Sequence, residues 1–260
     1  MDLVIRPSAE AAATLCAALV AERLRRKSDL VLGCATGRTM ESVYRELVKQ
    51  HEGGLEFSAC RTFNLDEYVG LAPDDPRSYH AYMKTHLFDH VDISLEHTHL
   101  PNGVAPDLGA ECRRFEAKIK EVGGIDLQLL GLGESGHIGF NEPLSSLMSR
   151  TRDKALTPTT WEQNAEFFGG AEHVPERALT MGVGTILEAK EIVTLVTGER
   201  KASILAKAAE GPITAMISAT ALQLHPNCKV IVDEAAAAEL QGQDYYRWIF
   251  EHEPEWRAYR

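Results

Sequence analysis

The chain has 260 residues, and its 27 lysines and arginines against 38 aspartates and glutamates give a formal net charge of −11. At about 150 residues per domain, this length allows one or two domains. The 44% hydrophobic and 25% charged residues are typical of a globular protein and exclude a disordered or collagen-like chain. The acidic balance argues against nonspecific binding of nucleic acid, which needs a basic surface. An anionic ligand must therefore meet local hydrogen-bond donors.

The sequence also predicts where the protein works. No stretch is long and apolar enough to span a membrane, and the amino terminus runs into an amphipathic helical pattern that does not resemble a secretory signal. The five cysteines form no CxxC pair, which favours reduced thiols over a disulfide framework or a zinc site. We therefore expect a cytoplasmic protein with most of its cysteines in the core.

Apolar runs alternate with helical patterns along the chain. Short buried strands are predicted at residues 29–34, 60–65, 125–131, 191–197 and 228–233, and helices near 8–26, 39–50, 77–88, 107–122, 199–209 and 214–222. Ser8 is the expected N-cap of the first helix, and Gly123-Gly124 ends the fourth. This alternation predicts an α/β fold with a mostly parallel sheet and helices on both faces. Because no repeat or linker divides the chain, we expect one domain, with ligands beyond the carboxyl ends of the strands.

The loop after the first predicted strand reads Cys34-Ala35-Thr36-Gly37-Arg38-Thr39. Small and hydroxyl residues at a strand-to-helix turn expose backbone N–H groups that bind anions. Arg38 can in addition bind a phosphate through two of its guanidinium nitrogens. The loop lacks the signatures of Walker and dinucleotide-binding loops, so it does not imply a nucleotide. A plain turn with Thr39 as the helix N-cap is the alternative.

Two adjacent carboxylates, Asp66 and Glu67, follow the second predicted strand. If both are half-buried, their repulsion raises the pKa of at least one of them, and a carboxylate at this position is a natural general base. A solvated acidic turn is the alternative. After the fourth predicted strand, Lys201 can reach a phosphate as a point charge, or it can simply lie on a solvated helix start.

The loop at residues 131–143, GLGESGHIGFNEP, has four glycines in its first nine residues and can approach a ligand closely. It holds His137, with Glu142 five residues further on. Histidine ordinarily titrates near neutrality, so a His–Glu pair can move protons in both directions. A lone histidine is usually structural, but its place in a glycine-rich loop after a buried strand favours a functional role. No second ligand stands at metal spacing, so zinc is not expected.

Five segments, taken in order, resemble the glucosamine-6-phosphate deaminase (isomerase) family. They are TFNLDEYVGL, SYHAYM, LGLGESGHIGFNEPLSSLMSRTR, ALTMGVGTILEAKEIVTLVTGERKA and TALQLHP. The likeness runs from about residue 29 to 235 and implies a modified Rossmann-like three-layer sandwich, with residues 1–260 as one domain and a lid near 152–180. It also implies conversion of glucosamine 6-phosphate to fructose 6-phosphate and ammonia in N-acetylglucosamine and amino sugar catabolism. This hydrolase or isomerase reaction would need no metal or organic cofactor.

The resemblance also assigns roles to single residues. Asp66 matches the base that moves a proton between C2 and C1, His137 matches the group that opens the sugar ring, and Glu142 matches its relay partner. Ser135 stands where many members carry Asp or Asn and can still orient the imidazole by a hydrogen bond. The phosphate site is matched by Thr36, Gly37, Arg38, Thr39 and Lys201.

Two further positions depart from the family pattern. Glu166 stands in the lid where the better-known members have a phosphate-binding arginine, and Arg38 stands where they have glycine. We therefore expect Arg38 to supply the missing cation. Hexameric members bind N-acetylglucosamine 6-phosphate at an allosteric site, whose positions are matched here by Ser145, Arg152 and Lys154, while Ala155 replaces a threonine. The resemblance thus allows a homo-oligomer whose only other partner is a sugar phosphate, with no nucleic acid or membrane.

Three alternatives stay open. The protein could deaminate another amino sugar phosphate, such as galactosamine 6-phosphate. It could be a lactonase of the same fold that hydrolyses 6-phosphogluconolactone, although a lactonase has no use for the enolising base Asp66. It could also be a regulator that binds a sugar phosphate without turnover, although the joint presence of Asp66, His137 and Glu142 speaks against this.

Overall fold

A sheet of seven parallel strands forms the centre of the computed structural model, which describes all residues 1–260. In spatial order the strands are β1 (Asp2–Arg6), β10 (Cys228–Asp233), β9 (Glu191–Val196), β6 (Leu127–Gly131), β2 (Val31–Cys34), β3 (Arg61–Asn64) and β5 (Thr98–His99). Every residue of β2, β9 and β10 is buried, as expected for a parallel sheet covered on both faces. The fold class is therefore confirmed, as are all five predicted strands.

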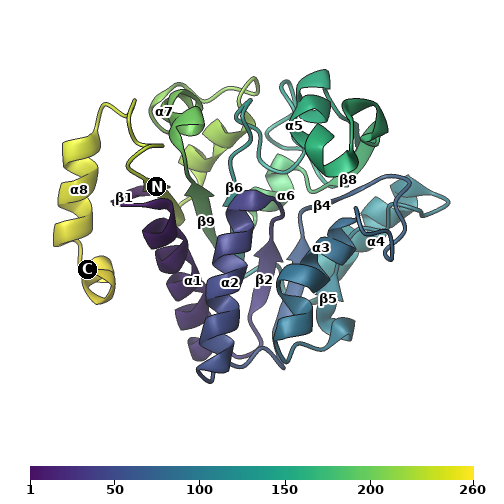
Figure 1. The fold of residues 1–260 in the computed structure, drawn as a ribbon, viewed down its shortest axis with the longest axis horizontal. Helices are drawn as coiled ribbons and strands as arrows, with labels where there is room; N and C mark the ends of the chain where they lie inside the picture. The colour runs from purple at the N-terminus through teal and green to yellow at the C-terminus, as the bar shows by residue number, and fades with distance from the viewer.

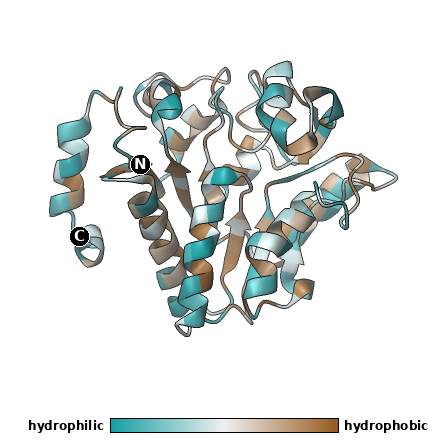
Figure 2. Ribbon diagram, viewed as in Figure 1, coloured by the Kyte–Doolittle hydropathy of each residue, from teal (hydrophilic) through white to brown (hydrophobic).

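Helices cover this central sheet. They are α1 (Ala9–Arg26), α2 (Arg38–Glu52), α3 (Tyr79–His86), α4 (Leu108–Glu121), α6 (Val183–Leu187), α7 (Ala202–Glu210) and α8 (Gln243–His252), with short 3₁₀ turns η1 (Phe88–His90), η2 (Leu95–His97), η4 (Glu199–Lys201) and η6 (Pro254–Tyr259). Ser8 caps α1 as predicted, since its Oγ accepts a hydrogen bond from the Ala11 amide at 3.2 Å. Hydrophobic residues concentrate in the central strands, while hydrophilic residues lie on the outer helix faces (Figure 2). None of the helices is long and apolar enough to cross a membrane.

A second, smaller sheet lies beside the first and is antiparallel. Its strands, in the order β4-β8-β7, are β4 (Asp66–Tyr68), β8 (Arg177–Thr180) and β7 (Arg152–Ala155). The helix α5 (Pro158–Phe168) and the turn η3 (Ala171–His173) connect β7 to β8. These elements pack around a separate cluster of seven buried residues: Tyr68, Leu71, Phe140, Leu156, Phe168, Val174 and Ala178. The predicted lid at 152–180 corresponds to β7, α5, η3 and β8, and its opening stays a prediction.

The structure differs from the sequence-based element assignment in a few places. The helix predicted near 214–222 is wrong: a bridge between Thr214 and Ile217 is followed by the 3₁₀ segment η5 (Ser218–Leu224). The strands β1 and β5, the small sheet, and helices α5, α6 and α8 were not predicted. In Figure 1, α8 and the carboxyl terminus lie beside the β1 edge, while β2 points toward the end where α5 and α7 lie. All five cysteines are buried and free.

Candidate active site

The parallel register brings the four predicted loops to one edge of the central sheet. Cys34 at the end of β2 pairs with Asn64 at the end of β3, and Gly131 at the end of β6 pairs with Leu195 near the end of β9. The segments that follow these strands therefore begin side by side. This is the edge at which open parallel sheets bind ligands.

The phosphate loop (residues 34–39) ends in a helix start that no side chain caps. Gly37 is the N-cap of α2, with φ of 108°, and the helix begins at Arg38. The alternative with Thr39 as N-cap is therefore wrong. Because a positive φ is strained for any residue with a Cβ, the turn favours glycine, and the Tyr82 hydroxyl fixes it by donating to the Gly37 carbonyl at 2.9 Å. The first amides of α2 remain available to an anion.

Asp66 is buried at the start of β4, with 6% of its surface exposed, and Glu67 beside it is fully buried. The alternative of a solvated acidic turn is therefore wrong. Glu67 accepts hydrogen bonds from the Tyr79 and His80 amides at the start of α3, each at 3.1 Å, whereas the Asp66 carboxylate accepts none. Burial in the first place, and the charge of Glu67 in the second, raise the pKa of Asp66 to about 8. A buried carboxyl without donors, which titrates near neutrality, is suited to take and return a proton.

Glycines let the His137 loop fold tightly around the imidazole. A Cβ on Gly133 would lie 2.2 Å from His137 Nε2, so a side chain there would displace the ring. A Cβ on Gly139 would lie 3.4 Å from Asp66 Oδ2, which shows that the backbone of this loop passes directly beside the predicted base. The structure thereby brings Asp66 and the His137 loop together, although they belong to different sheets.

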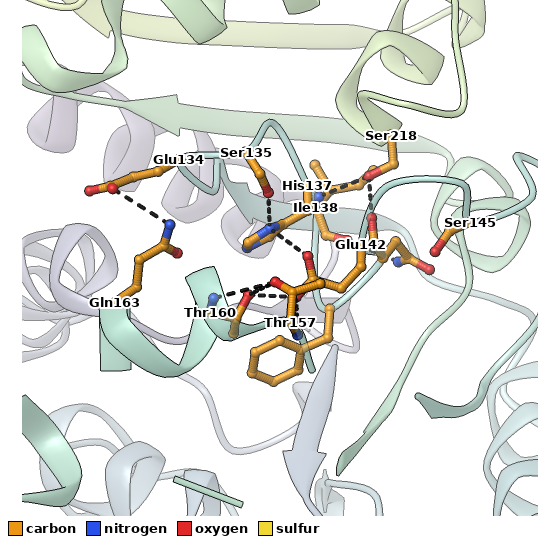
Figure 3. Close-up of polar contacts among 12 residues, drawn as sticks. Glu134, Ser135, His137, Ile138, Glu142, Ser145, Thr157, Thr160, Gln163 and Ser218 are labelled. Carbon is orange, nitrogen blue, oxygen red and sulfur yellow. Dashed lines mark hydrogen bonds and ion pairs between the residues drawn. The ribbon is translucent and has the colours of Figure 1, made fainter. Parts of the chain in front are cut away.

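Ser135 and Glu142 contact the same nitrogen of His137 (Figure 3). The Ser135 Oγ lies 2.7 Å from His137 Nδ1, and Glu142 Oε2 lies 3.6 Å from it. The side chains of His137 and Glu142 are only 11% and 2% exposed. Burial raises the pKa of Glu142, but its interaction with His137 and its hydrogen bond from Thr160 outweigh this effect and hold that pKa at about 2. Glu142 is therefore an anion poised beside the imidazole.

Two threonines that the sequence analysis did not single out also contact Glu142. Thr160 Oγ1 donates to Glu142 Oε1 at 2.5 Å, and Thr157 Oγ1 donates to the same oxygen at 3.2 Å. Thr157 is the N-cap of α5, and proline follows it at the first helical position. A Thr-Pro pair is a recognisable helix-start signal, so it could have located the helix. Nothing in the sequence pairs it with Glu142.

The two predicted phosphate cations differ in their surroundings. The Arg38 side chain, at the start of α2, is 82% exposed, and its Nη1 lies 3.3 Å from Glu166 Oε2 on α5. The side chain of Lys201, in η4, forms no hydrogen bond or ion pair in the structure. Burial is the main cause that lowers the pKa of Lys201. The two residues that depart from the family pattern, at positions 38 and 166, thus form an exposed ion pair with each other.

Two of the three residues predicted to bind an allosteric effector, Ser145 and Arg152, contact each other close to Glu142. Arg152 donates to Ser145 Oγ at 3.1 Å and to Asn141 Oδ1 at 2.9 Å, while Lys154 lies two residues further along β7. No carboxylate pairs with Arg152, and burial lowers its pKa. The structure thus joins Ser145 to Arg152 but shows no contact from either to Lys154.

A surface cavity of about 540 Å³ lies at a different place, next to residues 123–125 before β6 and Ala189 before β9. It includes none of the predicted site residues. Because these residues precede their strands, the cavity lies toward the opposite edge of the sheet from the four loops. The chain holds no group of three or more His, Cys, Asp and Glu side chains arranged to bind a metal ion.

Comparison with known proteins shows which protein family the sequence matches. The sequence profile of glucosamine-6-phosphate isomerases/6-phosphogluconolactonase matches residues 6–230. The glucosamine-6-phosphate deaminase of Hahella chejuensis is 50% identical over 250 residues, covering 96% of this chain and 95% of the relative. The deaminase of Rhodopirellula baltica is 52% identical over 241 residues, covering 92% and 96%.

Solved structures agree with this match. The structure of a monomeric glucosamine-6-phosphate deaminase superposes with a TM-score of 0.90 at 43% identity, covering 92% of this chain and 100% of the other. The 6-phosphogluconolactonase from Trypanosoma cruzi superposes with a TM-score of 0.75 at 18% identity, covering 92% and 97%. At that identity, the second likeness shows a shared fold only.

Proposed function

Since the chain belongs to the family of glucosamine-6-phosphate isomerases and 6-phosphogluconolactonases, we propose that it is an enzyme that converts glucosamine 6-phosphate and water to fructose 6-phosphate and ammonia. One observation carries the choice within the family: Asp66 is buried, receives no hydrogen bond and lies against the loop that holds His137. A proton transfer between two adjacent carbons needs such a base. Hydrolysis of a lactone does not.

The first chemical step is opening of the sugar ring. His137 gives a proton to the ring oxygen and then takes the proton of the anomeric hydroxyl, so that C1 becomes an aldehyde and the imidazole is protonated again. Glu142 stabilises the protonated imidazole from 3.6 Å, and Ser135 orients it through Nδ1. Histidine suits this exchange because it ordinarily gives and takes protons near neutral pH.

The second step is isomerisation. Asp66 removes the proton from C2 and His137 gives a proton to the C1 oxygen. The resulting enolamine then receives a proton at C1 from Asp66. This leaves an imine at C2. Water adds to the imine and ammonia leaves, which gives the ketone of fructose 6-phosphate. Because one water is consumed overall, the net reaction is hydrolytic although its central step is an isomerisation.

The phosphate anchors the substrate at the edge of the large sheet. The open amides at the start of α2, Arg38 and Lys201 are the groups we assign to it, together with Thr36, Gly37 and Thr39 of the loop. The Lys201 ammonium has no hydrogen-bond or ion-pair partner within the protein and is disfavoured by burial, so a phosphate would compensate its charge. Binding energy from this remote group can orient C1 and C2 against Asp66.

The effector site formed by Ser145, Arg152 and Lys154 is a separate proposal. Arg152 is half-buried without an anionic partner, which supports binding of a phosphate such as that of N-acetylglucosamine 6-phosphate. Calorimetric titration of the parent and of Arg152→Ala with this compound tests it: we expect binding to the parent only. Equal binding to both proteins would contradict it.

One assay separates the candidate functions. Ammonia release is measured with glucosamine 6-phosphate and with galactosamine 6-phosphate, and acid release with 6-phosphogluconolactone. We expect ammonia and fructose 6-phosphate from the first substrate, at a rate far above the other two. Faster turnover of galactosamine 6-phosphate would change the substrate, lactone hydrolysis alone would change the reaction class, and binding without turnover would identify a regulator.

A further inference from the structure

The start of helix α5 contacts the acidic partner of His137 directly. Three donors converge on Glu142 Oε1: the Thr157 amide at 3.4 Å, the Thr157 hydroxyl at 3.2 Å and the Thr160 hydroxyl at 2.5 Å. All three come from the predicted lid. The other oxygen, Oε2, is buried without a hydrogen-bond partner and is the atom that faces His137 Nδ1.

The backbone that carries Glu142 is anchored independently of α5. The Asn141 side chain donates to the carbonyls of Ile138 and Met181, at 2.9 and 2.8 Å, and Ser218 donates to the Asn141 carbonyl at 2.8 Å. The chain directly before Glu142 is thus fixed, while the rotation of its carboxylate is set by the threonines. Figure 3 shows the carboxylate lying between His137 on one side and Thr157 and Thr160 on the other.

We propose that Thr160 is a positioning residue, which holds Glu142 Oε1 so that Oε2 stays directed at His137 and thereby makes ring opening depend on the closed position of α5. The proposal rests on the proposed function. Thr160 is buried, with 1% of its surface exposed, and it donates the shortest of the three bonds. All three bonds go to a charged oxygen, which makes each stronger than a bond between neutral groups. The shortest of them makes the Thr160 hydroxyl the main connection between the lid and Glu142.

The arrangement explains how a lid can control chemistry without touching the reacting atoms. When α5 moves away, Glu142 Oε1 loses its donors, and the carboxylate is free to rotate away from His137. Closure over a bound sugar phosphate restores the donors and, with them, the orientation of Oε2. Ring opening, which needs the His137–Glu142 pair, would then occur only when the site is closed against water.

The test replaces the hydroxyl and keeps the shape. In Thr160→Val we expect kcat with ring-closed glucosamine 6-phosphate to fall about ten- to hundredfold, the range expected for a hydrogen bond to a charged group, while KM changes less than twofold. Thr160→Ser should stay within about threefold of the parent because it keeps the donor. Thr159→Val, at an exposed neighbouring position of the same helix turn, is the matched control and should equal the parent.

A readout that does not need turnover keeps this proposal separate from the proposed function. Loss of the Thr160 donor should raise the pKa of Glu142 above its value of about 2, which carbon NMR of the carboxyl group follows in protein without substrate. A parent without ammonia release would overturn the proposed function, whereas an unchanged Glu142 titration in Thr160→Val would overturn the positioning role.

Two other results would also overturn the proposal. They are parent-like kcat in Thr160→Val, and equal damage in the serine and valine variants, which would indicate a packing role only. If the valine variant does not fold, Thr160→Ala carries the same measurements.

Discussion

The large parallel sheet and the small antiparallel sheet contribute to the site in different ways. The phosphate loop, the His137 loop and Lys201 follow strands of the large sheet, whose core cluster contains 62 buried residues. Asp66 and α5 belong to the small-sheet region (β4, β7, β8 and α5), which packs around only seven buried residues. Because the free energy of local opening grows with buried apolar contact, we expect the small-sheet region to open more easily than the large sheet.

One strand of the small-sheet region is nevertheless tied to the large sheet. A single residue, Leu65, joins β3 to β4, and its carbonyl accepts a hydrogen bond from the Met181 amide at 2.7 Å. Asp66 is therefore held close to the end of β3. The strand β8 is held with it, because Thr180 pairs with Asp66, whereas α5 takes no part in this pairing. We therefore expect the base to stay fixed in place and α5 to be the part of the lid that moves.

The largest expected effect tests the fixed part. Asp66→Asn keeps the shape of the side chain but removes the base, so we expect kcat to fall by about 10²–10⁴ with the fold retained. Steady-state ammonia release and circular dichroism measure the two properties. Asp153→Asn, on the partly exposed strand β7 of the same small sheet, is the control and should keep parent activity. An Asp66→Asn variant with more than half of the parent kcat would show that the base lies elsewhere.

The same variant has a second, pH-dependent consequence. The pKa of Asp66 is raised in the folded protein from 3.8 to about 8, so between these values the unfolded chain has released this proton and the folded protein has kept it. The group therefore lowers the free energy of unfolding by up to about 1.4 kcal/mol for each unit of rising pH. Urea unfolding should show Asp66→Asn equal to the parent near pH 4 and increasingly more stable up to about pH 8. A gap that does not widen with pH would contradict the buried position of the carboxyl.

The two sheets also differ in how well the sequence predicts them. The strands of the large sheet are runs such as VLGC and EIVTLV that are buried throughout, and such runs are readable one by one. The small strands DEY and RDKA are short and charged. They are strands because of the partners they meet in three dimensions, which a local pattern cannot show.

The candidate site, like the two sheets, contains residues that the sequence predicts and residues that it does not. His137 and Asp66 were predicted because a glycine-rich loop and a carboxylate follow buried strands, and the structure places the two segments side by side. Thr160 was missed because a threonine in the first turn of a helix has an ordinary capping role. The pair of Arg38 and Glu166 joins residues 128 positions apart, and a contact at that separation leaves no periodic signal.

An intermediate effect is expected when the phosphate loop, which follows a strand of the large sheet, is changed. We expect Arg38→Ala to raise KM for glucosamine 6-phosphate by about one to two decades, since hydrogen bonds to charged groups contribute about 1.5–3 kcal/mol. Inhibition by inorganic phosphate should weaken in parallel, while inhibition by an unphosphorylated sugar analogue should not change. Adding Glu166→Arg to this variant should restore part of the loss if α5 closes over the phosphate. An unchanged KM would place Arg38 in solvent, as a residue that only starts the helix.

The smallest expected effect tests the contact between the two regions. If Arg38 binds the substrate phosphate as proposed, Glu166 on the lid competes with that phosphate, because it pairs with the same guanidinium. An exposed ion pair is weak, so Glu166→Gln should lower KM only by about 1.5- to fivefold. Glu162→Gln, an exposed neighbour on α5 without an ion-pair partner, should leave KM unchanged, and high salt should erase the difference between Glu166→Gln and the parent by screening the pair. A rise in KM for Glu166→Gln would reverse the interpretation, because the pair would then hold the lid closed over the substrate and stabilise the complex rather than compete with it.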